Sequence, residues 1–155
     1  MPIASDIRIV ELEPSSVASY RAISNHPEND ALRVVMKWAE ERDLLSGGTA
    51  RIFGFDNPGP AKDRSEYGYE VWLTVDPGVK DSAEIEIKDF PGGLYAVKRT
   101  NLPQIGEAWQ DIVEWRRNSK YVRSKRQCLE EHLNSSVGQP FDSVVIDLFL
   151  PIEEK

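Results

Sequence analysis

The stretch Cys128-Leu129-Glu130-Glu131-His132-Leu133-Asn134 has the pattern of a strand, yet it holds two adjacent carboxylates. Side chains alternate between the two faces of a strand, so one face receives Cys128, Glu130 and His132, and the other Leu129, Glu131 and Leu133. A charge in mid-strand is costly to bury unless it has a partner. The stretch therefore predicts either a solvated face or an acid that meets a positively charged group.

The composition is typical of one globular domain, which we expect to span residues 1–155. Of the 155 residues, 40% are hydrophobic and 29% charged, in the range of soluble folded proteins. The formal net charge of -7 argues against nonspecific binding to nucleic acid or to anionic membranes, because both require a basic face.

Cysteine and histidine are too few for the common covalent and metal-bound frameworks. Cys128 is the single cysteine, which excludes an intramolecular disulfide. With one cysteine and only His26 and His132 besides, we expect no closed zinc site. We also expect no cofactor. The segment Met1–Asp6 lacks a basic region followed by an apolar stretch, and no run is long enough to span a membrane. We expect a cytoplasmic protein.

Periodicity predicts four strands and one helix in the first part of the chain. The expected strands are 6–12, 17–23, 51–55 and 67–75. The helix begins near Pro27, ends at Gly47-Gly48, and carries an apolar stripe of Ala31, Val34, Val35, Trp38 and Ala39.

The second part of the chain follows the same order. The expected strands are 83–89, 94–99, 128–134 and 143–152. The helix is opened by Pro103 and carries a stripe of Ile105, Ala108, Trp109, Ile112 and Val113.

A shift of 77 positions (115 minus 38) superposes the two parts, with Trp38 on Trp115. The same shift lays 70–75 over 147–152 and puts Ala31 on Ala108. We interpret residues of about 6–76 and 83–152 as two strand-strand-helix-strand-strand repeats, neither of which buries its helix stripe alone. The predicted class is α+β, with one antiparallel sheet and both helices on one face.

The other face of this sheet is predicted to be aromatic and acidic. If Val71 and Leu148 pack under the helices, alternation sends their neighbours away from the helices, namely Glu70, Trp72, Asp147 and Phe149. The repeat register adds Phe53 and Phe55, matched by Glu130 and His132. Exposed aromatic clusters of this kind mark binding surfaces.

The order of short motifs resembles the GyrI-like (gyrase-inhibitory-protein-like) effector-binding domains, which also occur in AraC-type and MerR-type multidrug-responsive regulators. The resemblance rests on stretches spread over nearly the whole chain: Val17-Ala18-Ser19-Tyr20-Arg21, Phe55-Asp56-Asn57-Pro58, Tyr69-Glu70-Val71, Gly93-Leu94-Tyr95-Ala96-Val97, Ile105-Gly106-Glu107-Ala108-Trp109, Glu114-Trp115, Leu129–Asn134 and Leu148–Ile152. Two departures from the family pattern are Glu131-His132, where an apolar residue and a tyrosine are usual, and Asn101-Leu102-Pro103, where Gly-Pro is usual.

The resemblance implies a pseudo-twofold α+β fold with a ligand cleft on the sheet that takes hydrophobic, often cationic, small molecules. It also implies a glutamate at the base of the pocket, the position that Glu130 occupies, and Glu131 takes that role if a bulge shifts the register. The expected ligand-binding residues are Glu130, His132, Trp72, Phe149, Phe53, Phe55, Tyr67, Tyr69, Glu70 and Asp147. A carboxylate between aromatic rings attracts an organic cation by charge and by cation–π contact, worth roughly 0.5–2 kcal/mol for each ring.

Two other functions remain open at this stage. Glu130 with Glu70 or Asp147 is a candidate acid/base pair for a detoxifying hydrolase. A protein-binding module, such as a topoisomerase inhibitor, would use the one basic run: Arg116, Arg117, Lys120, Arg123, Lys125 and Arg126. The run is also explained by a helix C-terminus and a solvated loop. Direct DNA binding is not expected, because no helix-turn-helix segment lies outside the repeat.

Overall fold

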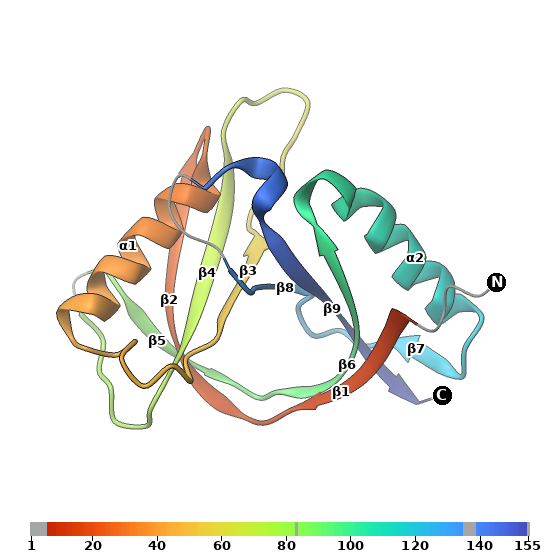
Figure 1. Cartoon of the computed structure of the whole chain (residues 1–155), viewed down its shortest axis with the longest axis horizontal. Helices are drawn as coiled ribbons and strands as arrows, with labels where there is room; N and C mark the ends of the chain where they lie inside the picture. The colour runs from red at the N-terminus through yellow and green to blue at the C-terminus, as the bar shows by residue number, and fades with distance from the viewer. Residues whose placement is uncertain (1–5, 83, 135–138, 155) are drawn as a thin grey trace. The chain divides into compact units, whose positions relative to one another are not determined.

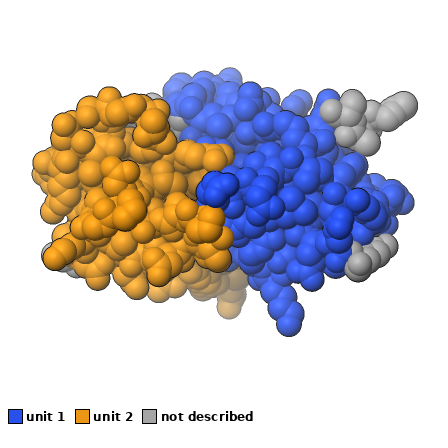
Figure 2. Space-filling view, turned by 90° about the horizontal axis from the view of Figure 1, so that it is seen from below, with its two compact units in different colours: residues 1–13, 92–135, 139–155 blue, residues 14–91, 136–138 orange. Residues whose placement is uncertain are grey.

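Antiparallel strands and two long helices make up the fold, as the computed structural model shows for residues 6–82, 84–134 and 139–154 (Figure 1). The expected strand start at Ala83 and the N-terminal residues 1–5 lie outside the described residues. The described chain forms two units, which Figure 2 shows in separate colours. Unit 2 consists of the described residues from 14 to 91, and unit 1 consists of the described residues up to 13 and from 92 onward. The predicted α+β class with antiparallel strands is confirmed.

Unit 2 contains four strands and the helix α1. Its elements are β2 (Ser15–Ser24), α1 (Pro27–Glu41), β3 (Ile52–Asp56), β4 (Tyr67–Val75) and β5 (Glu86–Phe90). The strands lie in the order β3-β4-β2-β5, and each pairing is antiparallel.

Unit 1 has the corresponding elements and one further short strand. Its elements are β1 (Ile7–Leu12), β6 (Gly93–Asn101), the 3-10 turns Leu102–Gln104 and Phe141–Ser143, α2 (Ile105–Arg117), β7 (Tyr121–Arg123), β8 (Leu129–His132) and β9 (Val145–Glu154). The strands lie in the order β1-β6-β9-β8, and β7 pairs with the end of β9.

The helix limits follow from local chemistry. Pro27 lies in the first turn of α1, and the acids Glu28 and Asp30 follow it. The helix ends at Glu41, before the glycine pair at which we expected it to stop. Before α2, the Asn101 side chain accepts a hydrogen bond from the backbone N–H of Gln104 at 3.0 Å, so the turn that leads into the helix is capped.

Each helix packs on one face of the strands of its own unit. In unit 2 the core includes Ala18, Ala31, Val35, Val71 and Leu73. In unit 1 it includes Ala96, Ala108, Ile112, Ile146, Leu148 and Leu150. We call the strand face that carries these residues the helix side and the opposite face the open face. No helix within the described residues is long and apolar enough to span a membrane.

The first strand of each expected sequence half pairs outside that half. Strand β1 pairs with β6 in unit 1, and β5 pairs with β2 in unit 2. The two units are therefore each completed by the first strand of the other sequence half. The repeat itself, with halves of about 6–76 and 83–152, remains our interpretation of the common element order.

Gly54 gives a test of core packing in unit 2. A methyl group at Gly54 would overlap the ring of Tyr69, which is buried in the core and has little room to move. We expect Gly54→Ala to lower the free energy of unfolding by roughly 1–3 kcal/mol, because an overfilled core forces its neighbours to shift.

Urea unfolding measures this change, with Gly106→Ala in α2 as the matched control. Nothing lies within 4 Å of a methyl group at Gly106, and alanine favours a helix, so this variant is expected to be as stable as the original or slightly more so. A Gly54→Ala protein as stable as the original would contradict the packing described.

Candidate functional site

The two adjacent glutamates of β8 lie on opposite faces of unit 1. Glu130 lies opposite Leu148 on β9, and Glu131 lies opposite Asp147. Directly opposed residues of an antiparallel pair project to the same face. Because Leu148 belongs to the core under α2, Glu130 is on the helix side and Glu131 is on the open face.

The expected placement of Glu130 and His132 on the aromatic face is therefore wrong, and the cause is a register difference of one residue. Phe53 pairs with Trp72 in unit 2, and Leu129 pairs with Phe149 in unit 1. If Trp72 corresponds to Phe149, Phe53 corresponds to Leu129, an offset of 76 (129 minus 53) in place of 77. A shift of one residue exchanges the two faces of a strand.

Burial shifts two pKa values on the helix side of β8. Burial lowers the pKa of His132 to about 4, because desolvation disfavours the charged imidazolium. Burial raises the pKa of the Cys128 thiol, Arg123 partly offsets this rise, and the charge of Glu130 adds to it. Cys128 packs against the unit 1 core, which agrees with the helix-side position of Glu130.

The open face of unit 1 holds a buried carboxylate, Asp147, between two arginines. Arg8 on β1 donates to its Oδ2 at 2.8 Å, and Arg99 on β6 donates through Nε at 2.9 Å and through Nη2 at 3.2 Å. Burial alone would raise the pKa of Asp147, but these hydrogen bonds and charges outweigh it and the pKa is lowered. Asp147 is thus a charged group with its own protein partners.

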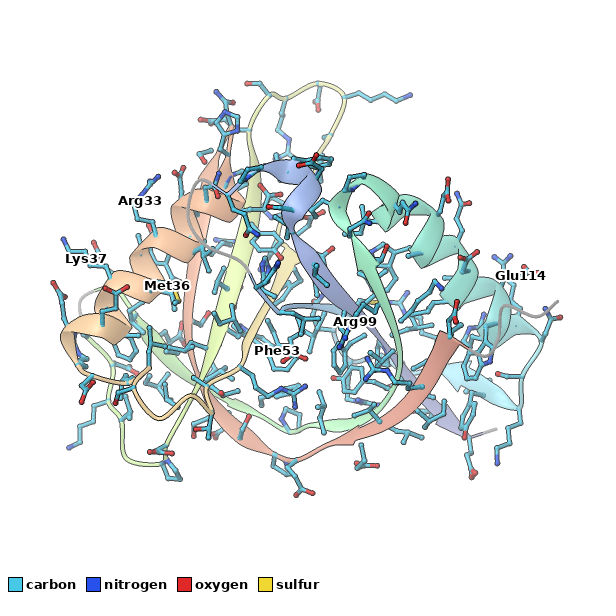
Figure 3. All side chains as sticks on the ribbon, in the orientation of Figure 1. Arg33, Met36, Lys37, Phe53, Arg99 and Glu114 are labelled. Carbon is cyan, nitrogen blue, oxygen red and sulfur yellow. The ribbon has the colours of Figure 1, made fainter. Side chains whose placement is uncertain are left out.

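Glu131 lies directly opposite Asp147 and is 8% exposed. The pKa of Arg99 is raised chiefly by its hydrogen bonds to Asp147, and the charge of Glu131 contributes as well. Figure 3 shows Arg99 on the side of β6 that faces away from α2. The open face of unit 1 therefore carries two acids and two arginines in one group.

Aromatic and apolar side chains adjoin this charged group. Phe149 packs edge-on against Tyr95 with ring centroids 5.7 Å apart, and Arg126 lies over the Tyr95 ring at 4.6 Å. The Tyr95 hydroxyl is buried and has no hydrogen-bond partner among the described residues. Burial also raises the pKa of this phenol, an effect that Arg126 partly offsets.

In unit 2 the corresponding acid is Glu70, and its oxygens are occupied by four donors. The Ser19 hydroxyl and the Trp72 indole donate at 2.7 Å, Lys88 Nζ at 2.8 Å and the Asn57 amide at 3.1 Å. Burial raises the pKa of Glu70, but the four hydrogen bonds outweigh this, so its pKa is lowered. The pattern indicates an internal anchor in the charged state.

Four aromatic rings lie beside Glu70 on the open face of unit 2. Trp72 packs against Phe55 with centroids 5.0 Å apart and against Phe90 at 5.5 Å, and Phe53 lies 6.2 Å from Phe90. Figure 3 shows Phe53 on the side away from α1. Phe53, Phe55 and Phe90 are buried and Trp72 is half-buried, so the expectation of an exposed aromatic cluster is wrong although the face is right.

Tyr67 and Tyr69 lie on the helix side and not at the edge of an open face. Tyr69 is part of the core under α1. The Tyr67 hydroxyl reaches both carboxylate oxygens of Glu28, on α1, at 2.7 Å. Alternation along β4 explains both positions, because Val71 also faces α1.

The structure thus brings together Glu131, Asp147 and Phe149 in unit 1, and Glu70, Trp72, Phe53 and Phe55 in unit 2. The sequence reading missed the groups that pair with these acids, which are Arg8, Arg99 and Lys88. No three acidic, histidine or cysteine side chains cluster to hold a metal ion within the residues that the structure describes.

The sequence of residues 5–153 matches the GyrI-like small molecule binding domain. The chain belongs to this family. As a member, it is a small-molecule-binding domain, and the resemblance inferred from its motifs is confirmed. No curated protein matches the sequence.

Solved structures with the same fold have low sequence identity to this GyrI-like domain. The EcmrR C-terminal domain is 13% identical with a TM-score of 0.74, over 96% of this chain and 98% of that one. In the cryo-EM structure of an EcmrR–DNA complex the TM-score is 0.76 at 13% identity, and the match spans 96% of this chain but only 57% of the EcmrR chain. A hydrolase from Listeria innocua is 10% identical with a TM-score of 0.68, over 96% and 92% of the two chains.

The lowered pKa of the half-buried His132 gives a test of its surroundings. Its folded pKa of about 4 lies below the value of 6.5 for a free histidine, so the folded state is stabilised fully above 6.5 and loses this stability as the pH falls toward 4. We expect a loss of about 2 kcal/mol between about pH 7 and pH 5.

Urea unfolding at several pH values measures this loss, and His132→Gln serves as the comparison. The lowered pKa values of Glu70 and Asp147 act only below their ordinary values of 4.5 and 3.8, so they contribute little above pH 5. The variant is expected to have a flatter profile in this window. Identical profiles for the two proteins would contradict the burial of His132.

Proposed function

We propose that this GyrI-like domain binds hydrophobic small molecules that carry a positive charge, and that Glu131 supplies the opposite charge. The observation that carries the proposal is the position of Glu131 on the open face of unit 1, opposite Asp147 and on the same face as Phe149. Sequence reasoning gave this role to Glu130, which the register moves to the helix side.

Glu70 and Asp147, which also lie on the open faces, are held in the charged state by the protein's own groups. Glu70 receives four hydrogen bonds, one of them from Lys88, and Asp147 is paired with two arginines. A ligand cation would have to displace those partners, at the cost of leaving a buried carboxylate less well satisfied. Glu131 is chosen for its position, on the same face of unit 1 as Phe149 and opposite Asp147.

A cation beside a largely buried carboxylate is held more strongly than one at an exposed acid, because solvent screens the pair less. Phe149 lies on the same face and is 1% exposed, so it adds apolar contact only when the side chains that cover it move aside. Binding in the micromolar range requires about 8 kcal/mol in total, which apolar burial and one charge pair can supply.

A structural relative supports this choice of ligand class. SAV2435, solved with bound tetraphenylphosphonium, is 11% identical with a TM-score of 0.56, over 95% of this chain and 93% of that one. Tetraphenylphosphonium is a lipophilic cation. We therefore assign the domain a role in sensing or sequestering such molecules.

The charge-pair mechanism predicts different effects for the two glutamates of β8. Glu131→Gln is expected to weaken binding of tetraphenylphosphonium about tenfold, because the variant keeps the size of the side chain and removes its charge. Glu130→Gln is the matched control at the adjacent position and is expected to change the affinity little. Isothermal titration calorimetry measures both.

A neutral analogue of the same shape separates charge from packing. Tetraphenylmethane derivatives made soluble by a neutral chain are expected to bind the original protein and Glu131→Gln alike. Equal weakening of the cation and the neutral analogue, or a larger effect of Glu130→Gln, would rule out Glu131 as the ligand acid.

A hydrolase is the second candidate function, and one observation favours it. Glu131 and Asp147 are opposed carboxylates on one face, and a Listeria innocua hydrolase shares the fold. We expect binding without turnover, since Asp147 is held in the charged state by two arginines and is a poor proton donor. Mass spectrometry of electrophilic test compounds after incubation distinguishes the two: unchanged compound supports a binding protein, and a product with one added water supports a hydrolase.

A further inference from the structure

The two arginines on Asp147 present their positive charge at exposed guanidinium groups, whereas the two acids of the same group, Asp147 and Glu131, are buried. The Asp147 side chain is 5% exposed, whereas those of Arg8 and Arg99 are 51% and 62% exposed. Both guanidinium groups are thus anchored at one end on a buried acid and open to solvent at the other.

The anchoring leaves most of their donors unused by Asp147. Arg99 binds Asp147 in a bidentate manner through Nε and Nη2, and Arg8 uses Nη2 alone. A guanidinium has more N–H donors than these bonds employ, and it prefers a planar acceptor such as a carboxylate. Nη1 of Arg99, and Nε and Nη1 of Arg8, have no hydrogen-bond partner among the residues that the structure describes.

The position of the cluster relates it to the proposed ligand acid. Arg99 and Asp147 are opposed on β6 and β9, and Asp147 is opposed to Glu131 on β8, so all three project to one face. Arg8 lies opposite Val97, and Val97 lies opposite Phe149, which puts Arg8 on the same face. A ligand that meets the carboxylate of Glu131 therefore lies on the same face as both guanidinium groups.

From this arrangement we infer that Arg8 and Arg99 form an anion-binding subsite, and that the preferred ligand carries an acidic group in addition to its apolar, positively charged body. The inference rests on the proposed function, since it concerns the same face. A ligand with only a positive charge would place that charge near two arginines, whereas a zwitterion matches both Glu131 and the arginine pair.

Rhodamine B and its ethyl ester test this inference. The two dyes share one cationic aromatic body, but rhodamine B has a free carboxylate that the ester blocks. We expect the original protein to bind rhodamine B about tenfold more tightly than the ester, since a carboxylate held by two guanidinium groups forms charge-assisted hydrogen bonds. Calorimetry or fluorescence anisotropy measures the ratio of the two affinities.

Substitutions assign the preference to the arginines. Arg8→Gln and Arg99→Gln each leave one guanidinium on Asp147, which protects folding, and each is expected to reduce the ratio several-fold by weakening only rhodamine B. Arg117→Gln, on α2, removes an equally exposed positive charge elsewhere and is expected to leave the ratio unchanged. Thermal unfolding verifies that the variants are folded.

The outcomes separate this inference from the proposed function. A ratio of one or below in the original protein, or a ratio that neither arginine variant alters, overturns the anion subsite. If the ester still binds and Glu131→Gln weakens it, the proposed function stands while the subsite fails. Failure of both dyes to bind contradicts both.

Discussion

The charge on the open face of unit 1 depends on the register in which β8 pairs with β9. Because strand side chains alternate, one residue of register decides whether Glu130 or Glu131 lies opposite Asp147. The observed register buries Leu129 beside Phe149 and gives Glu131 to the open face. Glu130 and His132 are then placed under α2, where burial keeps the imidazole neutral.

The two units share an element order but differ in how they treat buried acids. In unit 2 the buried acid Glu70 is occupied by neutral donors and one lysine, and aromatic rings lie on the same face. In unit 1 the acid Asp147 is shared by two arginines with exposed heads, and a second acid lies opposite it. The first arrangement is a closed network, and the second has donors that a ligand can use. This difference is what makes unit 1 the better candidate for charge recognition.

Much of the fold follows from periodicity, and the failures have local causes. The apolar stripes through Val35 and Ile112 predicted both helices, and the alternation of apolar and polar residues predicted the long strands. Strand β7 is too short to show such a pattern. Alternation with Val71 puts Tyr67 and Tyr69 on the helix side, although we expected both to bind the ligand. The family resemblance was readable from motifs spread over the chain, and the match over residues 5–153 confirmed it.

The candidate site was harder to read, because it depends on contacts between distant positions. Alternation placed Trp72 and Phe149 on the right face, and the repeat register added Phe53 and Phe55 to it. The face of β8 was predicted wrongly. Counted between equivalent positions, the chain from α2 to β8 is one residue shorter than the chain from α1 to β3, and the sequence of the strand does not reveal this difference. The bond between Arg8 and Asp147 joins residues 139 positions apart, beyond the reach of any local pattern.

We propose Glu131 as the acid that meets a bound cation. A crystal structure of the protein with tetraphenylphosphonium tests it most directly. The predicted result is a phosphonium on the open face of unit 1, nearer to the carboxylate of Glu131 than to any other acid and in contact with Phe149. A phosphonium beside Glu130 on the helix side, or one that contacts Glu70 after displacing Lys88, would contradict the claim.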